Sequence, residues 1–499
     1  MVYSGPSRGC ETCRWRKKKC DEARPSCIRC LKSNRTCKGY VDQATSKLAF
    51  RYVIPDSVQS PPQPKSMARK CSLPARVPAP GTNFLPDDAS PMEETDDGIE
   101  ELALRAFFHD YCVTSTNHTI SRGFLNGLEP MVLRCGLWSD YAKACKAVAF
   151  ASHGIKLHRP SLLRKAQTLY DELISSLARV MSLVNSSLLS AEVPTVVMLL
   201  GLYEMIVADE IYPRYHQVHA GGMAAMLRIE SSPLGLVKAA QSGHPLLTRG
   251  MSQGPFFVPY IGNEHQELDS ILHDTYGIWG KMNLFLADDV EALYLLQEEA
   301  LLINQRFLQW QDSVPTDFMP TTVGHLPPRS SATAPTVGHW PGPIDVYFDL
   351  YTAAVWNITR VARCFLIDII TKISDTLQDG RDYTREKIDA DRLLKELLSS
   401  IPYHLTECLP DFLRHMSKVS DIQTPGRAAG GLLLMHPIYL LCQLSIVSLE
   451  IREYLTRCLE WIGMNMGVGQ ASLLAKQSKE PRVDDLLSGC MIIWTGFLL

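Results

Sequence analysis

Residues 10–37 read CETCRWRKKKCDEARPSCIRCLKSNRTC, which includes six of the fifteen cysteines in this 499-residue chain. The spacing is Cys-x2-Cys-x6-Cys-x6-Cys-x2-Cys-x6-Cys, at Cys10, Cys13, Cys20, Cys27, Cys30 and Cys37. The last three cysteines repeat the first three after a shift of 17 residues. Residues 1–9 lack the apolar core of a signal peptide, so we expect these cysteines to bind metal rather than to form disulfides.

The number of thiolates limits how many metal ions they can hold. Four thiolates complete one tetrahedral zinc site, and a single zinc would leave two cysteines over. Two zincs need eight ligand positions, which six thiolates supply only if two of them bridge both ions. The repeat requires the bridging cysteines to be equivalent, such as Cys10 with Cys27. Each Cys-x2-Cys step also brings two sulfurs to the free N–H groups of a helix's first turn.

The charge of the chain is divided as unevenly as its cysteines. The whole chain has a formal charge of −3 and a pI near 6.5, which alone would argue against binding to nucleic acid. Residues 1–50, however, contain twelve Lys or Arg against four acids, a net +8, and the rest of the chain carries −11. A basic head on an acidic body is typical of a chain whose one end meets a polyanion.

The cysteine spacing and the basic run Arg14-Trp15-Arg16-Lys17-Lys18-Lys19 resemble the fungal binuclear zinc cluster transcription factors. The resemblance implies two Zn(II) ions bridged by Cys10 and Cys27. One ion would be held by Cys10, Cys13, Cys20 and Cys27, and the other by Cys10, Cys27, Cys30 and Cys37. Pro25 matches the family's proline between the two halves.

The resemblance also implies a nuclear regulator of RNA polymerase II transcription that reads CGG-type triplets in the major groove. Lys17 is the expected base reader, assisted by Arg16 or Lys18, while Arg14 and Lys19 are expected to hold phosphates. The same run could instead serve only for nuclear import. Expected partners are double-stranded DNA, the transcription machinery and, as an option, a second copy of the chain.

The expected organisation is mainly α-helical. Residues 1–40 form the zinc cluster domain, and residues 41–98, with nine prolines between Pro55 and Pro91 and an acidic end, form a linker. An acidic activation segment is the alternative for that end. A helical regulatory body follows in two parts, 99–311 and 346–499, separated by a proline-rich surface loop at 312–345 whose His325 and His339 are expected to be unligated.

The start of the body, residues 101–108, more weakly resembles the helical regulatory domain that follows such clusters, often in pathway-specific regulators, including those of secondary-metabolite gene clusters. Apolar residues at a 3.5-residue period over 163–184 predict an amphipathic helix, packed either on its neighbours or on a partner chain. A second stripe begins at Leu350. Residues 39–98 show no heptads, so the coiled coil with which many members dimerise is not expected there.

Other features of the sequence suggest alternative functions. Residues 428–449 contain no charged side chain, and we expect a buried helix interrupted at Pro437 rather than a membrane span. Gly250-Met251-Ser252-Gln253-Gly254 has the G-x-S-x-G spacing of serine hydrolases but lacks the flanking strand and helix, so no enzyme is expected. A small-molecule-gated helical receptor, whose DNA binding is secondary, remains an alternative without an identified ligand site. The nine other cysteines are expected to be ordinary buried or half-buried residues.

Overall fold

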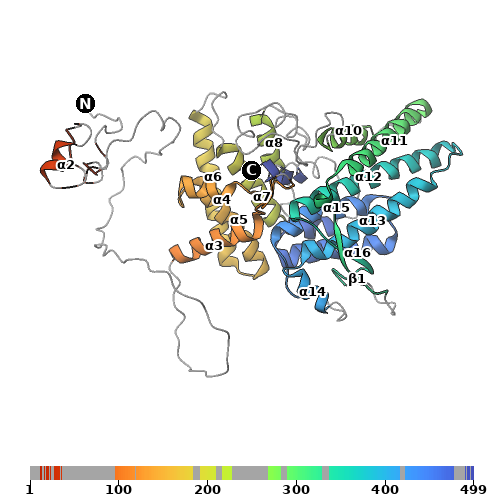
Figure 1. Ribbon diagram of the computed structural model, residues 1–499. Helices are drawn as coiled ribbons and strands as arrows, with labels where there is room; N and C mark the ends of the chain where they lie inside the picture. Colours follow the sequence, from red (N-terminus) through yellow and green to blue (C-terminus); the bar gives the residue numbers. More distant parts are fainter. Residues whose placement is uncertain are drawn as a thin grey trace, which may run out of the picture. The chain divides into compact units, whose positions relative to one another are not determined.

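The structure is a computed structural model of the 499-residue chain (Figure 1). It describes much of 10–37, and then 96–118, 120–183, 192–209, 216–227, 268–281, 289–328, 336–415, 422–476 and 489–498 apart from 491 and 495. The chain divides into two compact units, Met1–Ala89 and Ser90–Leu499. In the first unit, one helix is bounded, α2 (Ile28–Lys32), and residues 12–13 are also helical.

The second unit begins with a group of helices around α5. Its helices are α3 (Asp96–Tyr111), α4 (Leu128–Cys135), α5 (Asp140–Lys156), α6 (Pro160–Leu183), α7 (Glu192–Val207) and α8 (His216–Leu227). Helix α5 is rich in alanine, and it contacts α3, α4, α6, α7 and the later helix α16 (Leu449–Met466). Its small side chains allow close approach: a Cβ on Gly154 would lie 2.8 Å from the Leu163 side chain of α6. The Ser139 hydroxyl caps α5 by accepting from the Ala142 N–H.

The remaining elements complete the same unit (Figure 1). They are α10 (Leu268–Gly280), α11 (Val290–Ser313), η2 (Thr316–Phe318), β1 (Thr321–Leu326), β2 (Gly342–Val346), α12 (Leu350–Leu377), α13 (Thr384–Leu405), α14 (Leu409–His415), α15 (Ala428–Gln443), α16 (Leu449–Met466), α17 (Gly469–Lys476) and η3 (Gly496–Leu498). Helix α12 contacts α10, α11, α13 and α15, which explains why its stripe of apolar residues is largely buried. The body is mainly helical, as the sequence predicted.

The expected loop at 312–345 differs from the observed structure. Strands β1 and β2 pair antiparallel with an irregularity between Thr322 and Gly324, and β2 packs against α13. The hydroxyl of Thr322 donates to the Asp345 carboxylate at 2.6 Å, and Ile344 is fully buried. The strand pair tolerates Pro343, which has no backbone N–H to donate, because in a two-stranded sheet one side of each strand needs no hydrogen-bond partner. The segment is therefore part of the body and not only a surface loop.

One hydrophobic core extends through both expected parts of the body. The C-terminal residues connect them: the Phe497 ring lies 5.5 Å from Phe124 and 5.3 Å from Tyr351. The Leu125 N–H also donates to the Gly496 carbonyl at 2.7 Å. The expected division at 312–345 therefore does not separate two cores.

The expected interruption at Pro437 is wrong, because helix α15 continues through this residue to Gln443. Proline removes one backbone hydrogen bond and costs about 3 kcal/mol in a helix interior. Almost all of α15 is buried, and its packing between α12, α13 and α16 offsets that cost. Among the described residues, no helix has the length and apolar character needed to cross a membrane.

The predicted helix at 163–184 is α6, and its apolar stripe faces its own chain. Ala166 and Leu173 are fully buried, and the Tyr170 ring stacks on Tyr203 of α7 at 4.7 Å. Of the two alternatives for this stripe, the observed packing is the intramolecular one; Val184 lies outside the described residues.

Candidate metal centre and nucleic-acid interface

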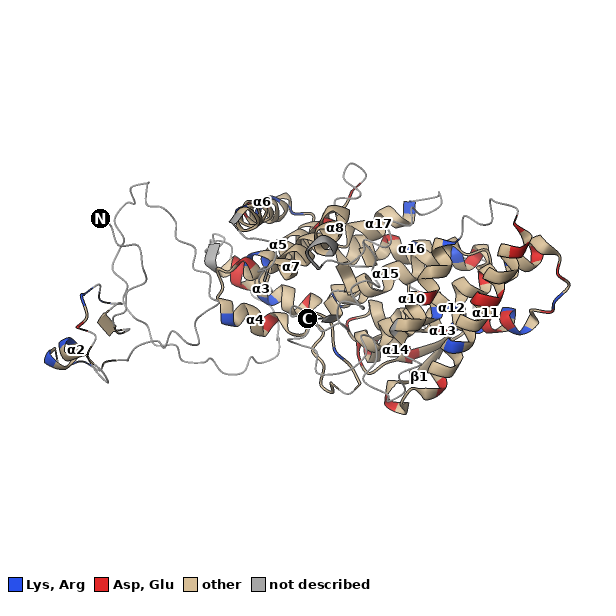
Figure 2. Cartoon of the chain, turned by 90° about the horizontal axis from the view of Figure 1, so that it is seen from above, with Lys and Arg blue, Asp and Glu red and all other residues tan. Residues whose placement is uncertain are grey.

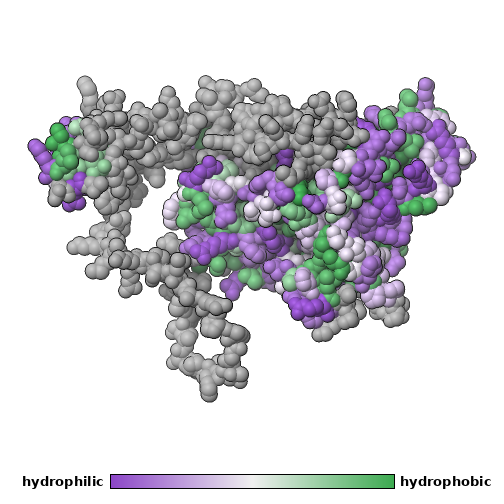
Figure 3. Space-filling view, viewed as in Figure 1, coloured by the Kyte–Doolittle hydropathy of each residue, from purple (hydrophilic) through white to green (hydrophobic). Residues whose placement is uncertain are grey.

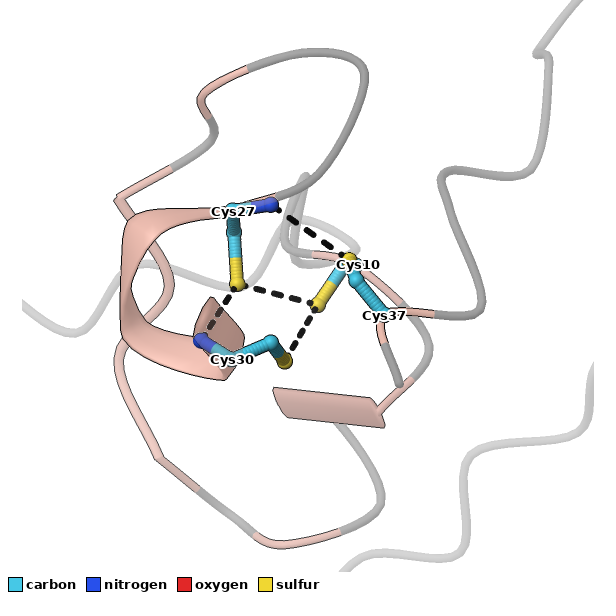
Figure 4. A group of neighbouring side chains, drawn as sticks. All are labelled: Cys10, Cys27, Cys30 and Cys37. Atoms are coloured by element: carbon cyan, nitrogen blue, oxygen red, sulfur yellow. Dashed lines mark hydrogen bonds between the residues drawn. The ribbon is translucent and has the colours of Figure 1, made fainter. Parts of the chain in front are cut away.

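The six cysteines of the head form two overlapping groups of sulfur atoms, and Figure 4 shows the group of Cys10, Cys27, Cys30 and Cys37. Cys10, Cys13, Cys20 and Cys27 form one group in which all four Sγ atoms lie within 4.8 Å of one another. Cys10, Cys27, Cys30 and Cys37 form a second group by the same measure. Cys10 and Cys27 belong to both groups, and their Sγ atoms are 3.6 Å apart.

The backbone around the cluster follows the 17-residue repeat. The Cys13 N–H points to the Cys10 Sγ at 3.4 Å, and the Cys30 N–H points to the Cys27 Sγ at 3.3 Å. A second matching pair joins the Cys10 N–H to the Cys20 Sγ at 3.3 Å and the Cys27 N–H to the Cys37 Sγ at 3.4 Å. Each half thus offers its sulfurs N–H donors, which stabilise the thiolate form.

The donor set fits zinc. Zn–S bonds of about 2.3 Å in a tetrahedron place sulfurs roughly 3.8 Å apart, and the Cys10–Cys27, Cys13–Cys27 and Cys10–Cys30 Sγ distances are 3.6, 3.6 and 3.8 Å. The Cys13 and Cys30 sulfurs, which fall in different groups, are also only 3.9 Å apart. Burial raises the pKa of the Cys10 thiol to about 12 and also raises that of Cys27. Dications would provide the positive charge that six crowded thiolates need.

Asp21 and Arg29 hold the chain beside the cluster. The Asp21 carboxylate accepts from the Ile28 N–H at 2.8 Å and from the Arg29 N–H at 3.3 Å, at the start of α2. Burial opposes the charged form, but these backbone bonds lower the pKa of Asp21. The Arg29 guanidinium donates to the Lys19 carbonyl at 2.6 Å. Neither residue was predicted from the sequence, because Asp21 lies seven residues before Ile28 and both residues bind backbone groups.

The basic loop is described in part. Lys18 and Lys19 are exposed and Arg16 is half-buried, whereas Arg14, Lys17 and Pro25 lie outside the described residues. The Arg16 N–H bonds the Thr12 carbonyl at 3.3 Å and the Lys18 N–H bonds the Cys13 carbonyl at 3.0 Å, so the turn that starts at Cys13 continues into the loop. Helix α2 adds further positive charge to the head through Arg29 and Lys32, as Figure 2 shows.

The remaining candidate residues lie elsewhere. Ser252 is outside the described residues. His325 is exposed on β1, and His339 is buried with its ring 4.9 Å from Phe412. Of the other cysteines, Cys112, Cys145, Cys364, Cys442, Cys458 and Cys490 are buried as expected. Cys135 and Cys408 are exposed, which differs from the expectation, and Cys71 is not described.

A six-sulfur centre beside a cationic loop, joined to a helical body, defines a metal-stabilised DNA-binding regulator. Residues 8–47 match the fungal Zn(2)-Cys(6) binuclear cluster domain. The chain is also 47% identical to transcription factor dbaG of Emericella nidulans, over 83% of this chain and 100% of that protein. The chain therefore belongs to the fungal Zn(2)-Cys(6) binuclear cluster transcription factors.

Two further similarities are shorter. Transcriptional regulatory protein moc3 of Schizosaccharomyces pombe is 48% identical over 58 residues, 11% of either chain. An uncharacterized transcriptional regulatory protein of the same yeast is 41% identical over 63 residues, 12% of either chain. No solved structure matches the chain.

Family membership confirms several expectations. The protein is a nuclear, DNA-binding transcription factor and not an enzyme, and its cluster binds two zinc ions. Zinc is redox-inactive and has a structural role in such sites: it crosslinks a head too short to fold on apolar burial alone.

Proposed function

We propose that the protein is a pathway-specific regulator of RNA polymerase II transcription that reads CGG-type triplets through its zinc-folded head. One zinc is held by Cys10, Cys13, Cys20 and Cys27, and the other by Cys10, Cys27, Cys30 and Cys37. The observation that carries this proposal is the pair of overlapping four-sulfur groups, which share only Cys10 and Cys27.

Contacts to DNA are assigned to the basic loop between Cys13 and Cys20. Arginine and lysine reach guanine O6 and N7 in the major groove, and each good contact contributes about 1–3 kcal/mol of discrimination. Lys17 is the base reader, with Arg16 or Lys18 assisting, and Arg14 and Lys19 bind phosphates. The fixed Lys19 carbonyl and the backbone turn at Arg16 and Lys18 support this proposal, because they orient a loop that would otherwise lose binding energy on ordering.

Two heads acting together are part of the proposal, because a single triplet is too short to select an operator. A homodimer is the simplest arrangement. Helix α6 is not the dimer helix in this proposal, since its apolar stripe packs on α5 and its Tyr170 ring stacks on Tyr203 of α7. Control of a secondary-metabolite gene cluster is the proposed pathway, supported by the family resemblance of the helical body.

Selection from random DNA tests the proposal. The zinc-loaded full-length protein is incubated with a random duplex library, and bound molecules are sequenced over several rounds. We expect enrichment of CGG-type triplets, in pairs at a fixed spacing if the protein acts as a dimer. Enrichment of unrelated sequences, or none above the input library, contradicts the proposed readout. Transcript profiling after deletion of the gene tests the pathway: a coordinated loss or gain across one contiguous gene cluster is expected.

A further inference from the structure

An apolar pocket in the body is lined by residues of α10, α12, α15 and the C-terminal segment. Its walls are aromatic and aliphatic, with Trp279, Phe365, Leu440 and Ile493 among them. The Trp279 and Phe365 rings stack at 5.2 Å with their planes 30° apart, which forms a flat wall. The cavity has a volume of about 130 Å³ and is partly open to the surface. Cavities of this size lined by apolar side chains accept a benzene-sized group.

The walls carry no charged side chain among the described residues. A charged ligand would lose its hydration there without a counterion, which excludes organic acids and amines as good ligands. The Thr275 hydroxyl is already used, since it donates to the Ile271 carbonyl at 2.8 Å. Burial raises the pKa of the Cys490 thiol to about 12, so this wall residue is a poor nucleophile and binding is expected to be reversible.

His436 provides the polar group that this pocket leaves unsatisfied. The residue lines the pocket from α15, is only 4% exposed, and its Nε2 has no hydrogen-bond partner among the described parts of the chain. An unpaired buried polar atom loses its hydration without compensation, so native proteins rarely keep one without a ligand or water. Burial and the charge of His216 lower the pKa of His436 to about 3, so its ring is neutral.

We propose that this pocket is an effector site for a neutral aromatic compound with one hydroxyl or carbonyl group, which hydrogen-bonds His436 Nε2. The ring system occupies the slot beside Trp279 and Phe365, and any larger part of the molecule extends through the opening. Size, wall chemistry and the unpaired imidazole nitrogen each favour this class. This role is separate from DNA binding, and it assigns a class of small-molecule ligand to the helical body.

Such a ligand contacts segments that are distant in sequence. Residues of α10, α12, α15 and the C-terminal segment line one cavity, so an occupant adds contacts among all four. Because a ligand stabilises the state that binds it, occupancy should stabilise the folded body.

Calorimetric titration of the zinc-loaded full-length protein with 2-naphthol at pH 7 tests the proposal. Naphthalene serves as the ligand without a hydroxyl, and 2-naphthoate as the charged one. We expect 2-naphthol to bind about fivefold or more tightly than naphthalene, and 2-naphthoate not to bind. Equal affinity of 2-naphthol and naphthalene overturns the role of His436, and absence of binding by 2-naphthol overturns the site. DNA is not part of the assay, so its failure leaves the proposed DNA readout untouched.

Two variants place the binding in this pocket. His436→Phe keeps the ring volume and removes the unpaired nitrogen, so we expect an unchanged or higher melting temperature and loss of the preference for 2-naphthol over naphthalene. Leu440→Trp narrows the pocket and should abolish binding of both compounds. Leu302→Trp, the same change at an exposed position of α11, should bind like the unaltered protein. Retention of the 2-naphthol preference in a folded His436→Phe variant, or of binding in Leu440→Trp, contradicts the proposal.

Discussion

At the scale of single residues, Cys10 and Cys27 differ from the other four cysteines of the head because each belongs to both sulfur groups. We predict that Cys27→Ser loses both zincs and unfolds the head, since each structural site contributes about 10–16 kcal/mol of apparent binding energy. Cys37→Ser removes a ligand of one group only and should keep the first zinc more tightly than the second.

Native mass spectrometry of the full chain measures these zinc counts. Cys408→Ser is the matched control, because that cysteine is exposed and lies outside the head. It should retain two zincs. A Cys27→Ser variant that retains two zincs and full DNA binding shows that the proposed bridging is wrong.

The lysines of the basic loop should separate into two kinds. Lys17→Ala is predicted to reduce selectivity at a guanine by about 1–3 kcal/mol, because it removes a base contact. Lys19→Ala is predicted to weaken specific and random DNA alike and to flatten the dependence of affinity on salt concentration, because it removes a phosphate contact. Binding isotherms on both DNAs at several salt concentrations measure this. Equal losses on specific and random DNA for Lys17→Ala contradict the distinction.

At the scale of helices, α12 and α13 are joined by buried charges. The Arg363 side chain is fully buried, and its guanidinium donates to Asn304 at 3.0 Å and pairs with Asp389 at 3.2 Å. We predict that Asp389→Ala destabilises the body by about 3–5 kcal/mol, because it leaves an uncompensated buried charge. Denaturant unfolding followed by helical circular dichroism measures the change.

Asp391→Ala is the control for that substitution, two residues further along the same helix. Asp391 pairs with Lys395 at 2.6 Å, but both side chains are more than 60% exposed. Exposed pairs of this kind contribute about 0.5 kcal/mol or less. Similar effects of the two substitutions would show that burial of Arg363 is not what makes its ion pair matter.

His404 gives the contact between α13 and α15 a dependence on pH. Asn357 donates to His404 Nε2 at 3.2 Å, and His404 Nδ1 donates to the Gly430 carbonyl at 3.1 Å, which requires a neutral ring. Burial, with a further effect of the Arg360 charge, lowers the pKa of His404 to about 4. The unfolded value is about 6.5, so this contribution to stability is complete above that pH and is lost as pH falls towards 4.

We predict that His404→Gln lowers the free energy of unfolding by about 1–2 kcal/mol at pH 7, through weaker hydrogen bonds. It should also reduce the further loss of stability between pH 6.5 and pH 4, because glutamine does not titrate. Urea unfolding at several pH values measures both quantities. His415→Gln, at an exposed histidine of α14, should behave like the unaltered protein. A pH dependence that His404→Gln leaves unchanged contradicts this assignment.

At the scale of the whole molecule, spacing and period predicted the features that depend on local pattern. The 17-residue cysteine repeat predicted the two sulfur groups, and the stripes in α6 and α12 predicted helices. Pattern could not predict β1 and β2, because their pairing joins residues about 20 positions apart and is stabilised by contacts such as Thr322 with Asp345. It also could not show that Pro437 stays within α15, where tertiary packing outweighs a local preference.

The metal site was likewise predicted only in part. The sulfur ligands could be found from spacing because the chemistry of zinc limits the choices, whereas Asp21 and Arg29 act through backbone groups that have no sequence signature. The pocket beside His436 was not predictable, because its walls come from three helices and a terminal segment that only folding brings together. The net charge of −3 concealed the basic head because a sum over the whole chain does not show where the charges lie in the sequence.

Zinc titration of the metal-free full-length protein tests the central claim, that two zincs fold the head that reads DNA. Binding to the selected DNA site is measured by fluorescence anisotropy at each zinc-to-protein ratio. We expect no specific binding without zinc and a rise that reaches its plateau at two zincs per chain. Full specific binding at one zinc per chain, or without zinc, would contradict it.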